Sequence, residues 1–262
     1  MSRRKIVDPP LTRRCVVSSG VRAATGALVF ANLPAVAKET ISFPSADEVV
    51  PPEWSQWANE CVLTSVAEEG PYFIDDRIFR RDIRDGQHGQ DLLLRLQVID
   101  APRCEPLPDA VVEIWHCNAL GYYSGYAGQD PDADPTEITD IVDHLPEQSS
   151  ERWLRGAQRS DDEGNCEFLT IYPGWYAGRT VHIHVKVHLN NSRLITSQLY
   201  FPQELNDRIH RTGDYRAHGI SPYRNESDVD IAMSSGAGGS WPAVTRNGDV
   251  YTASLRVGVL SS

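Results

Sequence analysis

Residues 181–189 alternate strictly between apolar and polar side chains, and no other feature of the chain constrains its fold as strongly. Successive residues of a β-strand point to opposite faces of a sheet, so this alternation predicts a strand with one apolar face. Val181, Ile183, Val185 and Val187 are expected to pack into a core. The intervening polar residues, three of them histidines, would project from the opposite face.

Other segments of the 262-residue chain have the same strand-like composition. They lie between turn signals such as Asp85-Gly86 and Asn247-Gly248, and no long segment repeats with the 3.6-residue period of a helix. We therefore predict an all-β protein, an antiparallel β-sandwich with long loops that carry the function. Besides 181–189, the predicted strands are residues 92–99, 110–115, 166–172, 193–200 and 250–259.

Residues 1–37 differ from the rest of the chain and resemble an export signal. The pair Arg13-Arg14 precedes a weakly apolar stretch that ends in small residues, as in a twin-arginine signal with a cleavage site. We expect export by this route, to the periplasm or the medium, with one β-sandwich domain over residues 38–262. The alternative is a basic arm on a cytoplasmic protein. The stretch is too short and polar for a stable membrane span.

Two further segments carry weaker expectations. Residues 53–60 are compatible with a short helix, and residues 126–160 are expected to form a long polar loop packed over the sandwich.

Four cysteines lie outside the export segment, at positions 61, 104, 117 and 166. They permit two disulfides, and four cysteines can pair in three ways. We expect at least one disulfide, because exported proteins retain them. The alternative is four buried thiols.

The charge of the chain limits its partners. The formal net charge is −11, and because residues 1–37 contribute +5, the remainder carries −16. Such an acidic surface argues against nucleic acid and anionic membranes as partners. An anionic small substrate is not excluded, since salt screens distant charges over about 10 Å. A homo-oligomer is also left open.

His182 and His184 are the first candidates for a functional site, as ligands of a metal ion. Two residues apart on a strand, they lie on one face about 6–7 Å apart at Cα, so both rings can reach one metal ion. Taken alone, the pair is equally typical of a strand whose polar face meets water. Tyr176 and Arg179 stand just upstream, after a Pro-Gly pair at 173–174 that predicts a turn. This turn would bring them near the start of the strand.

Several blocks together resemble the intradiol ring-cleavage dioxygenases, the family of protocatechuate 3,4-dioxygenase and catechol 1,2-dioxygenase. Residues 115–123 match W-(Q/H)-x-N-x-x-G-x-Y, residues 173–176 match P-G-x-Y, and residues 179–184 match R-x-x-H-x-H. Residues 196–201 match a later T-x-Q-x-Y-F block. Residues 61–73 are similar to the front end of the secreted branch. No single block is specific, but their combination is.

The resemblance implies one Fe(3+) ion held by four side chains. Tyr123 and Tyr176 would bind as phenolates, and His182 and His184 as imidazoles. The Gly-x-Tyr spacing selects Tyr123 over the adjacent Tyr122. Anionic oxygen ligands favour iron(III), and a bound cation deprotonates phenols that would otherwise stay neutral.

The implied reaction is cleavage of a catechol-type ring by dioxygen to a muconate-type diacid. Tyr176 would leave the metal when the catechol binds, and Arg179 would stabilise charge on the ring. Gln198 would orient substrate or oxygen. The competing interpretations are a surface salt bridge for Arg179 and a polar residue on the sheet face for Gln198.

Two other functions are weighed against this one. A cupin-like iron(II) oxygenase also uses a His-x-His strand, but it needs a Glu shortly afterwards, where this chain has His188. A secreted, non-catalytic β-sandwich binding module would explain the fold and the export signal. Such a module does not explain why two tyrosines, an arginine and the histidine pair occur together in these motifs.

Overall fold

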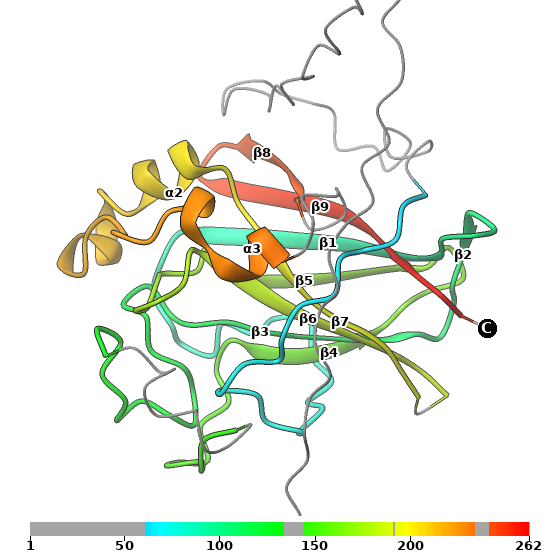
Figure 1. The fold of residues 1–262 in the computed structure, drawn as a ribbon, viewed down its shortest axis with the longest axis horizontal. Coiled ribbons are helices and arrows are strands. Elements are labelled where there is room, and N and C mark those ends of the chain that lie inside the picture. Colours follow the sequence, from blue (N-terminus) through cyan, green and yellow to red (C-terminus); the bar gives the residue numbers. More distant parts are fainter. Residues whose placement is uncertain (1–60, 134–143, 191, 234–240, 262) are drawn as a thin grey trace, which may run out of the picture. The chain divides into compact units, whose positions relative to one another are not determined.

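The computed structural model describes residues 61–133, 144–190, 192–233 and 241–261, which form nine β-strands in two sheets (Figure 1). The predicted all-β sandwich is confirmed, whereas the export segment and the helix predicted at 53–60 lie outside these residues. The strands are β1 (Asp91–Asp100), β2 (Glu105–Pro106), β3 (Val111–Trp115), β4 (Arg155–Arg159), β5 (Asn165–Ile171), β6 (His182–Leu189), β7 (Ser192–Tyr200), β8 (Ala243–Asn247) and β9 (Val250–Val259).

The two sheets differ in their strand directions. One has the order β4-β3-β6-β7 and is antiparallel throughout. The other has the order β2-β1-β9-β8, with β5 also pairing along β1. In this second sheet β1 and β9 run parallel, so the prediction of a wholly antiparallel sandwich is wrong for this pair. A parallel pair requires a long connection, and here most of the domain lies between the two strands.

All six predicted strands are confirmed, with small shifts at their ends, and three strands were missed. The clearest miss is β4, which lies inside the predicted loop at 126–160 and reads RGAQR, with no apolar alternation. It is a strand because it pairs along β3 and because Gly156 lets Ile83 pack closely against its backbone. Such long-range contacts leave no periodic signal in the sequence.

The helical elements are short, which agrees with the absence of a 3.6-residue period. They are α2 (Gln203–Ile209), α3 (Val229–Met233) and the 3₁₀ turns η2 (Gly213–Ala217) and η3 (Asn225–Ser227). Among the helices described, none has the length and apolar character that a membrane span requires.

The four-stranded sheet is buried on both of its faces. The valines of β6 and Ile183 pack into the core between the sheets, as expected. The polar residues of β6 project from the opposite face, as expected, and His182, His184 and His188 are buried there as well. A second apolar cluster covers this face; it comprises Tyr72, Phe73, Ile74, Trp115, Cys117, Tyr123, Tyr126, Leu145 and Tyr176.

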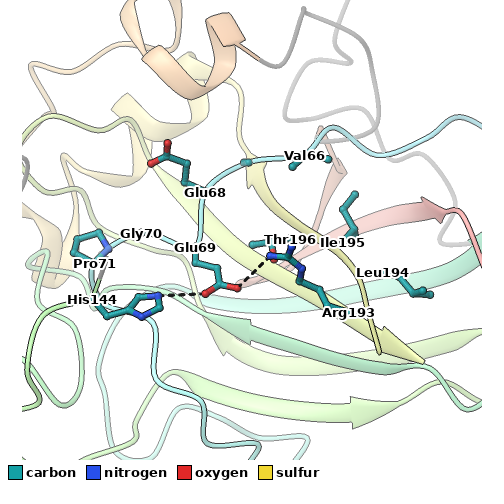
Figure 2. Close-up of a pocket in the computed structure, with 11 residues that line it drawn as sticks. Val66, Glu68, Glu69, Gly70, Pro71, His144, Arg193, Leu194, Ile195 and Thr196 are labelled. Carbon is teal, nitrogen blue, oxygen red and sulfur yellow. Dashed lines mark ion pairs between the residues drawn. The ribbon is translucent and has the colours of Figure 1, made fainter. Parts of the chain in front are cut away.

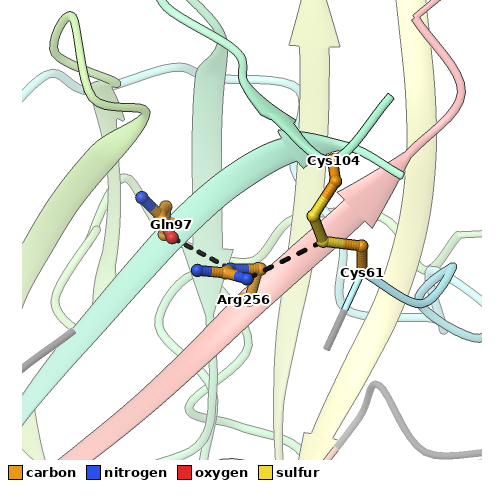
Figure 3. Close-up of a disulfide and its surroundings, with 4 residues drawn as sticks. All are labelled: Cys61, Gln97, Cys104 and Arg256. Atoms are coloured by element: carbon orange, nitrogen blue, oxygen red, sulfur yellow. Dashed lines mark hydrogen bonds between the residues drawn. A yellow bond between two sulfur atoms is a disulfide. The ribbon is translucent and has the colours of Figure 1, made fainter. Parts of the chain in front are cut away.

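A disulfide joins Cys61 to Cys104, so the expectation of at least one disulfide is confirmed (Figure 3). Their Cα atoms are 5.3 Å apart, and Arg256 lies beside the bond, where it also donates to Gln97. The bond ties the first described residues to the turn after β1. The cysteines at 117 and 166 are buried free thiols.

A candidate metal centre

His182 and His184 point from β6 toward a common position on the outer face of their sheet. Their Nε2 atoms lie 3.1 Å apart, and both rings are almost fully buried. Nδ1 of His182 lies 2.7 Å from the backbone oxygen of Thr180. This contact favours a proton on Nδ1, which leaves the lone pair of Nε2 directed at the neighbouring ring.

The ring of His184 is held by two neighbours. Trp115, its partner across the β3–β6 pairing, stacks on it with ring centres 4.7 Å apart and planes 4° apart. The segment before β1 also approaches it closely, because a Cβ at Gly70 would lie 3.4 Å from its Cε1 atom. The side chain therefore has little freedom to leave the position it shares with His182.

Tyr176 reaches the histidines through a turn other than the predicted one. Turn residues lie at Ala177-Gly178, where Tyr176 and Arg179 face each other as an isolated antiparallel bridge. The Pro-Gly pair at 173–174 adopts no turn, so that prediction is wrong in position, although Tyr176 still reaches the start of β6. Its hydroxyl lies 3.3 Å from Nε2 of His182.

Gly174 serves a different purpose from the predicted turn. A Cβ there would lie 2.5 Å from the backbone oxygen of Asn118, so only glycine allows this segment to pass close to the loop after β3. The amide of Gly174 donates to the same oxygen over 3.1 Å. This contact holds together the two segments that carry Tyr176 and Tyr123.

Tyr123, and not Tyr122, faces the histidines. The ring of Tyr123 lies 5.6 Å from that of Tyr176 and 6.3 Å from that of His184, centre to centre. Tyr122 packs against another apolar cluster around Trp153. The chain therefore brings together all four side chains expected to bind the metal.

These four groups fit a bound cation. Two ligands about 2.1 Å from one ion, at a right angle, lie about 3 Å apart, close to the observed donor separations of 3.1 and 3.3 Å. Burial lowers the pKa of both histidines, so the rings are neutral and can donate lone pairs. The buried hydroxyl of Tyr123 has no hydrogen-bond partner among the described residues, which a metal ion would provide.

The charge state of the tyrosines depends on such a cation. Burial raises the pKa of Tyr123, and the neighbouring Tyr176 raises it further. Burial also raises the pKa of Tyr176, while the positive charge of Arg179 opposes this shift. Without a cation both phenols stay protonated at neutral pH, and a bound cation reverses this preference.

Arg179 and Gln198 form one buried network beside the histidines. Arg179 pairs with Asp228 over 2.9 Å and with Asp230 over 2.8 Å, and only 12% of its side chain is exposed. It also donates to the side-chain oxygen of Gln198, which lies opposite His184 in the β6–β7 pairing. Arg179 is therefore not a surface salt bridge, and Gln198 is a polar residue on the face of β7 that is fully buried.

Sequence reasoning missed two further residues around Tyr123. Tyr72 stacks on it with ring centres 4.6 Å apart and contacts Tyr176 edge-on at 5.8 Å. Arg155 lies 5.9 Å from the Tyr123 ring centre and donates to backbone oxygens of Tyr72 and Ser124. Burial lowers the pKa of Arg155 to about 10. Tyr72 lies in the 61–73 block that resembles the secreted branch, so the resemblance could have pointed to it. Arg155 lies on β4, whose sequence shows no strand pattern that could have pointed to it.

The segment that includes Glu69 and Gly70 lines a surface pocket (Figure 2). The pocket measures about 560 Å³, and Gly70 lines it while also approaching the His184 ring. Glu69 holds the segment in place through ion pairs with Lys186 on β6 and with His144. Gly70 therefore lies between this pocket and the ring of His184.

Known proteins are similar to this chain in sequence and in fold. Residues 68–233 match the family model described as Dioxygenase. Catechol 1,2-dioxygenase 1 of Acinetobacter lwoffii is 26% identical over 153 residues, which cover 50% of this chain and 43% of that protein. The protocatechuate 3,4-dioxygenase beta chain of Burkholderia cepacia is 30% identical over 142 residues, which cover 49% of this chain and 52% of that one. The chain thus spans about half the length of these relatives.

A solved structure shares the fold over more of the chain. The intradiol ring-cleavage dioxygenase from Tetranychus urticae is 27% identical, with a TM-score of 0.67, and the match covers 76% of this chain and 94% of that one. Together with the family match over more than half of its residues, this similarity shows that the chain belongs to the intradiol ring-cleavage dioxygenases.

Proposed function

We propose that this protein cleaves the ring of a catechol-type aromatic between its two hydroxyl-bearing carbons. Dioxygen is the second substrate, and a muconate-type diacid is the product. The observation that carries the proposal is the convergence of two tyrosines and two histidines on one buried position, in a member of this family. A cupin-like oxygenase or a non-catalytic binding module gives no reason for that arrangement.

We further propose that Tyr123, Tyr176, His182 and His184 hold iron(III). Two phenolates are hard, anionic donors, and two imidazoles complete a set that suits iron better than zinc or magnesium. Bound there, iron(III) would act as a Lewis acid and template that makes the catechol ring reactive toward dioxygen.

The surrounding residues support this chemistry in two ways. The aromatic rings of Tyr72 and Trp115 keep water away, which strengthens every charge interaction inside the site. Burial outweighs the opposing charge of Arg179 and raises the pKa of Tyr176, so this hydroxyl would become a phenolate only with a bound cation. In our proposal Tyr176, held as a phenolate when iron(III) is bound, would take a proton from the incoming catechol, and Tyr123 would remain a ligand.

Oxygen uptake with a panel of catechols tests the proposal. The iron-loaded protein is expected to consume dioxygen and form a ring-opened diacid, and His184→Ala is expected to lose both iron and turnover. His188→Ala is the matched control, because His188 lies on the same face of β6 and is also buried. Full iron occupancy and unchanged turnover in His184→Ala would refute the ligand assignment.

We also propose that the protein is exported. The disulfide between Cys61 and Cys104 supports this, because such bonds persist in oxidising compartments. Mass spectrometry of the protein from each cell fraction is expected to find it outside the cytoplasm with a new N-terminus near residue 38. A full-length chain confined to the cytoplasm would contradict the proposal.

A further inference from the structure

Arg179 is held by buried side chains at two of its three guanidinium nitrogens. Its Nε atom donates to Asp228 over 2.9 Å, and Nη2 lies 2.8 Å from Asp230 and also donates to the side-chain oxygen of Gln198. The two aspartate side chains are 0% and 7% exposed. In the part of the chain that the structure describes, Nη1 has no hydrogen-bond partner, so its N–H groups are left for a ligand.

The hydrogen-bonding capacity of Gln198 is fully used within the protein. Its amide nitrogen donates to Asp230 over 2.9 Å and to the backbone oxygen of Glu68 over 3.1 Å. Its oxygen accepts from Arg179 and from the hydroxyl of Tyr200. An amide side chain has two hydrogens to donate and two lone pairs to accept with. A contact between Gln198 and substrate or dioxygen, which the family resemblance implies, would therefore break one of these four bonds.

Asp230 closes a ring of hydrogen bonds with Arg179 and Gln198. Its Oδ2 atom accepts from both residues, which are also bonded to each other. A carboxylate only accepts hydrogen bonds, so the nitrogen end of the Gln198 amide must face Asp230. The oxygen end is thereby directed at Arg179. Asp230 lies in the first turn of α3, so this short helix fixes the orientation of two side chains beside the histidines.

The guanidinium held in this way acts on the candidate metal centre. Burial raises the pKa of Tyr176, and the positive charge of Arg179 opposes this rise. Burial lowers the pKa of His182 and His184, and the charge of Arg179 contributes to the decrease. Arg179 therefore lies close enough to the proposed ligands to act on negative charge that develops on a bound catechol.

We propose that Asp230 is a positioning residue that acts through Arg179, and that Gln198 acts in the same way and does not touch the substrate. Together they hold Nη2, which leaves Nη1 directed at the ring of the catechol. A donor that is already in place stabilises developing charge without having to reorient during the reaction. This inference rests on the proposed function and adds to it the residues that set the position of Arg179.

A double-mutant cycle on the iron-loaded full chain tests the inference, with catechol as substrate. Asp230→Asn is expected to lower kcat by about tenfold, because the guanidinium loses its fixed position. In the Arg179→Lys background the same change should cost no more than about twofold, since no guanidinium is left to position. Asp207→Asn is the control: Asp207 on α2 pairs with Arg224, and its loss should leave kcat unchanged in both backgrounds.

A second cycle with Gln198→Met separates positioning from contact with the substrate. Methionine has a similar volume but cannot hold Arg179, so kcat should again fall in the wild-type background and hardly change beside Arg179→Lys. A Gln198 that touches the substrate predicts the same fold loss in both backgrounds. Iron content and circular dichroism establish that each variant is folded and loaded.

The possible outcomes each decide the inference. Wild-type kcat in Asp230→Asn, or equal fold losses in the two backgrounds of either cycle, contradicts it and leaves the proposed function intact. If Asp230→Asn does not fold, the Gln198→Met cycle decides, and failure of both variants to fold shows a structural role and also contradicts the inference. A wild-type protein that cleaves no catechol contradicts the proposed function before any variant is made.

Discussion

Burial sets the charge of single side chains on the outer face of the four-stranded sheet. Glu113 on β3 lies 3.9 Å from His188 and 3.8 Å from Arg77. Burial raises the pKa of Glu113 to about 7, and it lowers the pKa of His188 to about 4. His188 is therefore neutral at pH 7, and its contact with Glu113 is not an ion pair. Glu113 instead keeps its proton to unusually high pH.

This shift predicts a loss of stability as the pH rises. Between the ordinary pKa of 4.5 and the folded value near 7, the folded protein holds a proton that the unfolded chain has lost. We expect this carboxyl to cost about 2–3 kcal/mol of unfolding free energy between pH 5 and pH 8. Glu113→Gln removes that cost.

Urea unfolding of both proteins at the two pH values measures the effect. The unfolding free energy of Glu113→Gln minus that of the wild type should be about 2–3 kcal/mol larger at pH 8 than at pH 5. Other titrating groups are common to the two proteins and cancel in this comparison. A difference that is the same at pH 5 and pH 8 would show that Glu113 has an ordinary pKa.

At the scale of elements, the disulfide constrains the segment that leads into the site. Cys61 and Cys104 are separated by 43 residues, and this stretch includes Tyr72 and Gly70 as well as β1. Closing a loop of this length reduces the entropy of the unfolded chain. We expect Cys104→Ser to lower the unfolding free energy by about 3 kcal/mol.

Denaturant unfolding with and without a thiol reductant checks this expectation. Reductant should lower the midpoint of the wild-type protein to that of Cys104→Ser and leave the variant itself unchanged. Cys166→Ala is the control, because its thiol is free and its response to reductant should match that of the wild type. An unchanged wild-type midpoint in reductant would mean that the bond contributes nothing to stability.

The strands were predictable to different degrees, for physical reasons. Local alternation located β6 and β9, because each has one face in the core between the sheets. It could not show that the other face of β6 is also covered, since Tyr72 and Phe73 come from a distant segment. It also missed β4, where contacts with Ile83 and β3 replace apolar alternation.

The site residues divide in the same way. The Gly-x-Tyr spacing pointed to Tyr123 because Gly121, with φ of +91°, adopts a backbone conformation that favours glycine beside the Trp175 carbonyl. Asp228 and Asp230 carried no such signal. They reach Arg179 from the segment around α3, outside every strand that the pattern predicted.

At the scale of the whole molecule, the fold places reactive side chains between two buried apolar clusters. The core between the sheets fixes β6, and the outer cluster fixes the rings of Tyr123 and Tyr176 above it. A metal that binds only the folded chain adds its binding energy to the stability of the whole domain. Iron(III) should therefore raise the unfolding temperature of the metal-free protein.

Titration of the metal-free protein with iron(III) tests the central claim most directly. We expect one iron per chain, with a visible absorption band from phenolate ligands. Tyr123→Phe should lose at least tenfold in iron affinity and part of the band, because it lacks one anionic donor. A wild-type protein that stays colourless, or a Tyr123→Phe variant with unchanged affinity and absorption, would contradict the four-ligand ferric site.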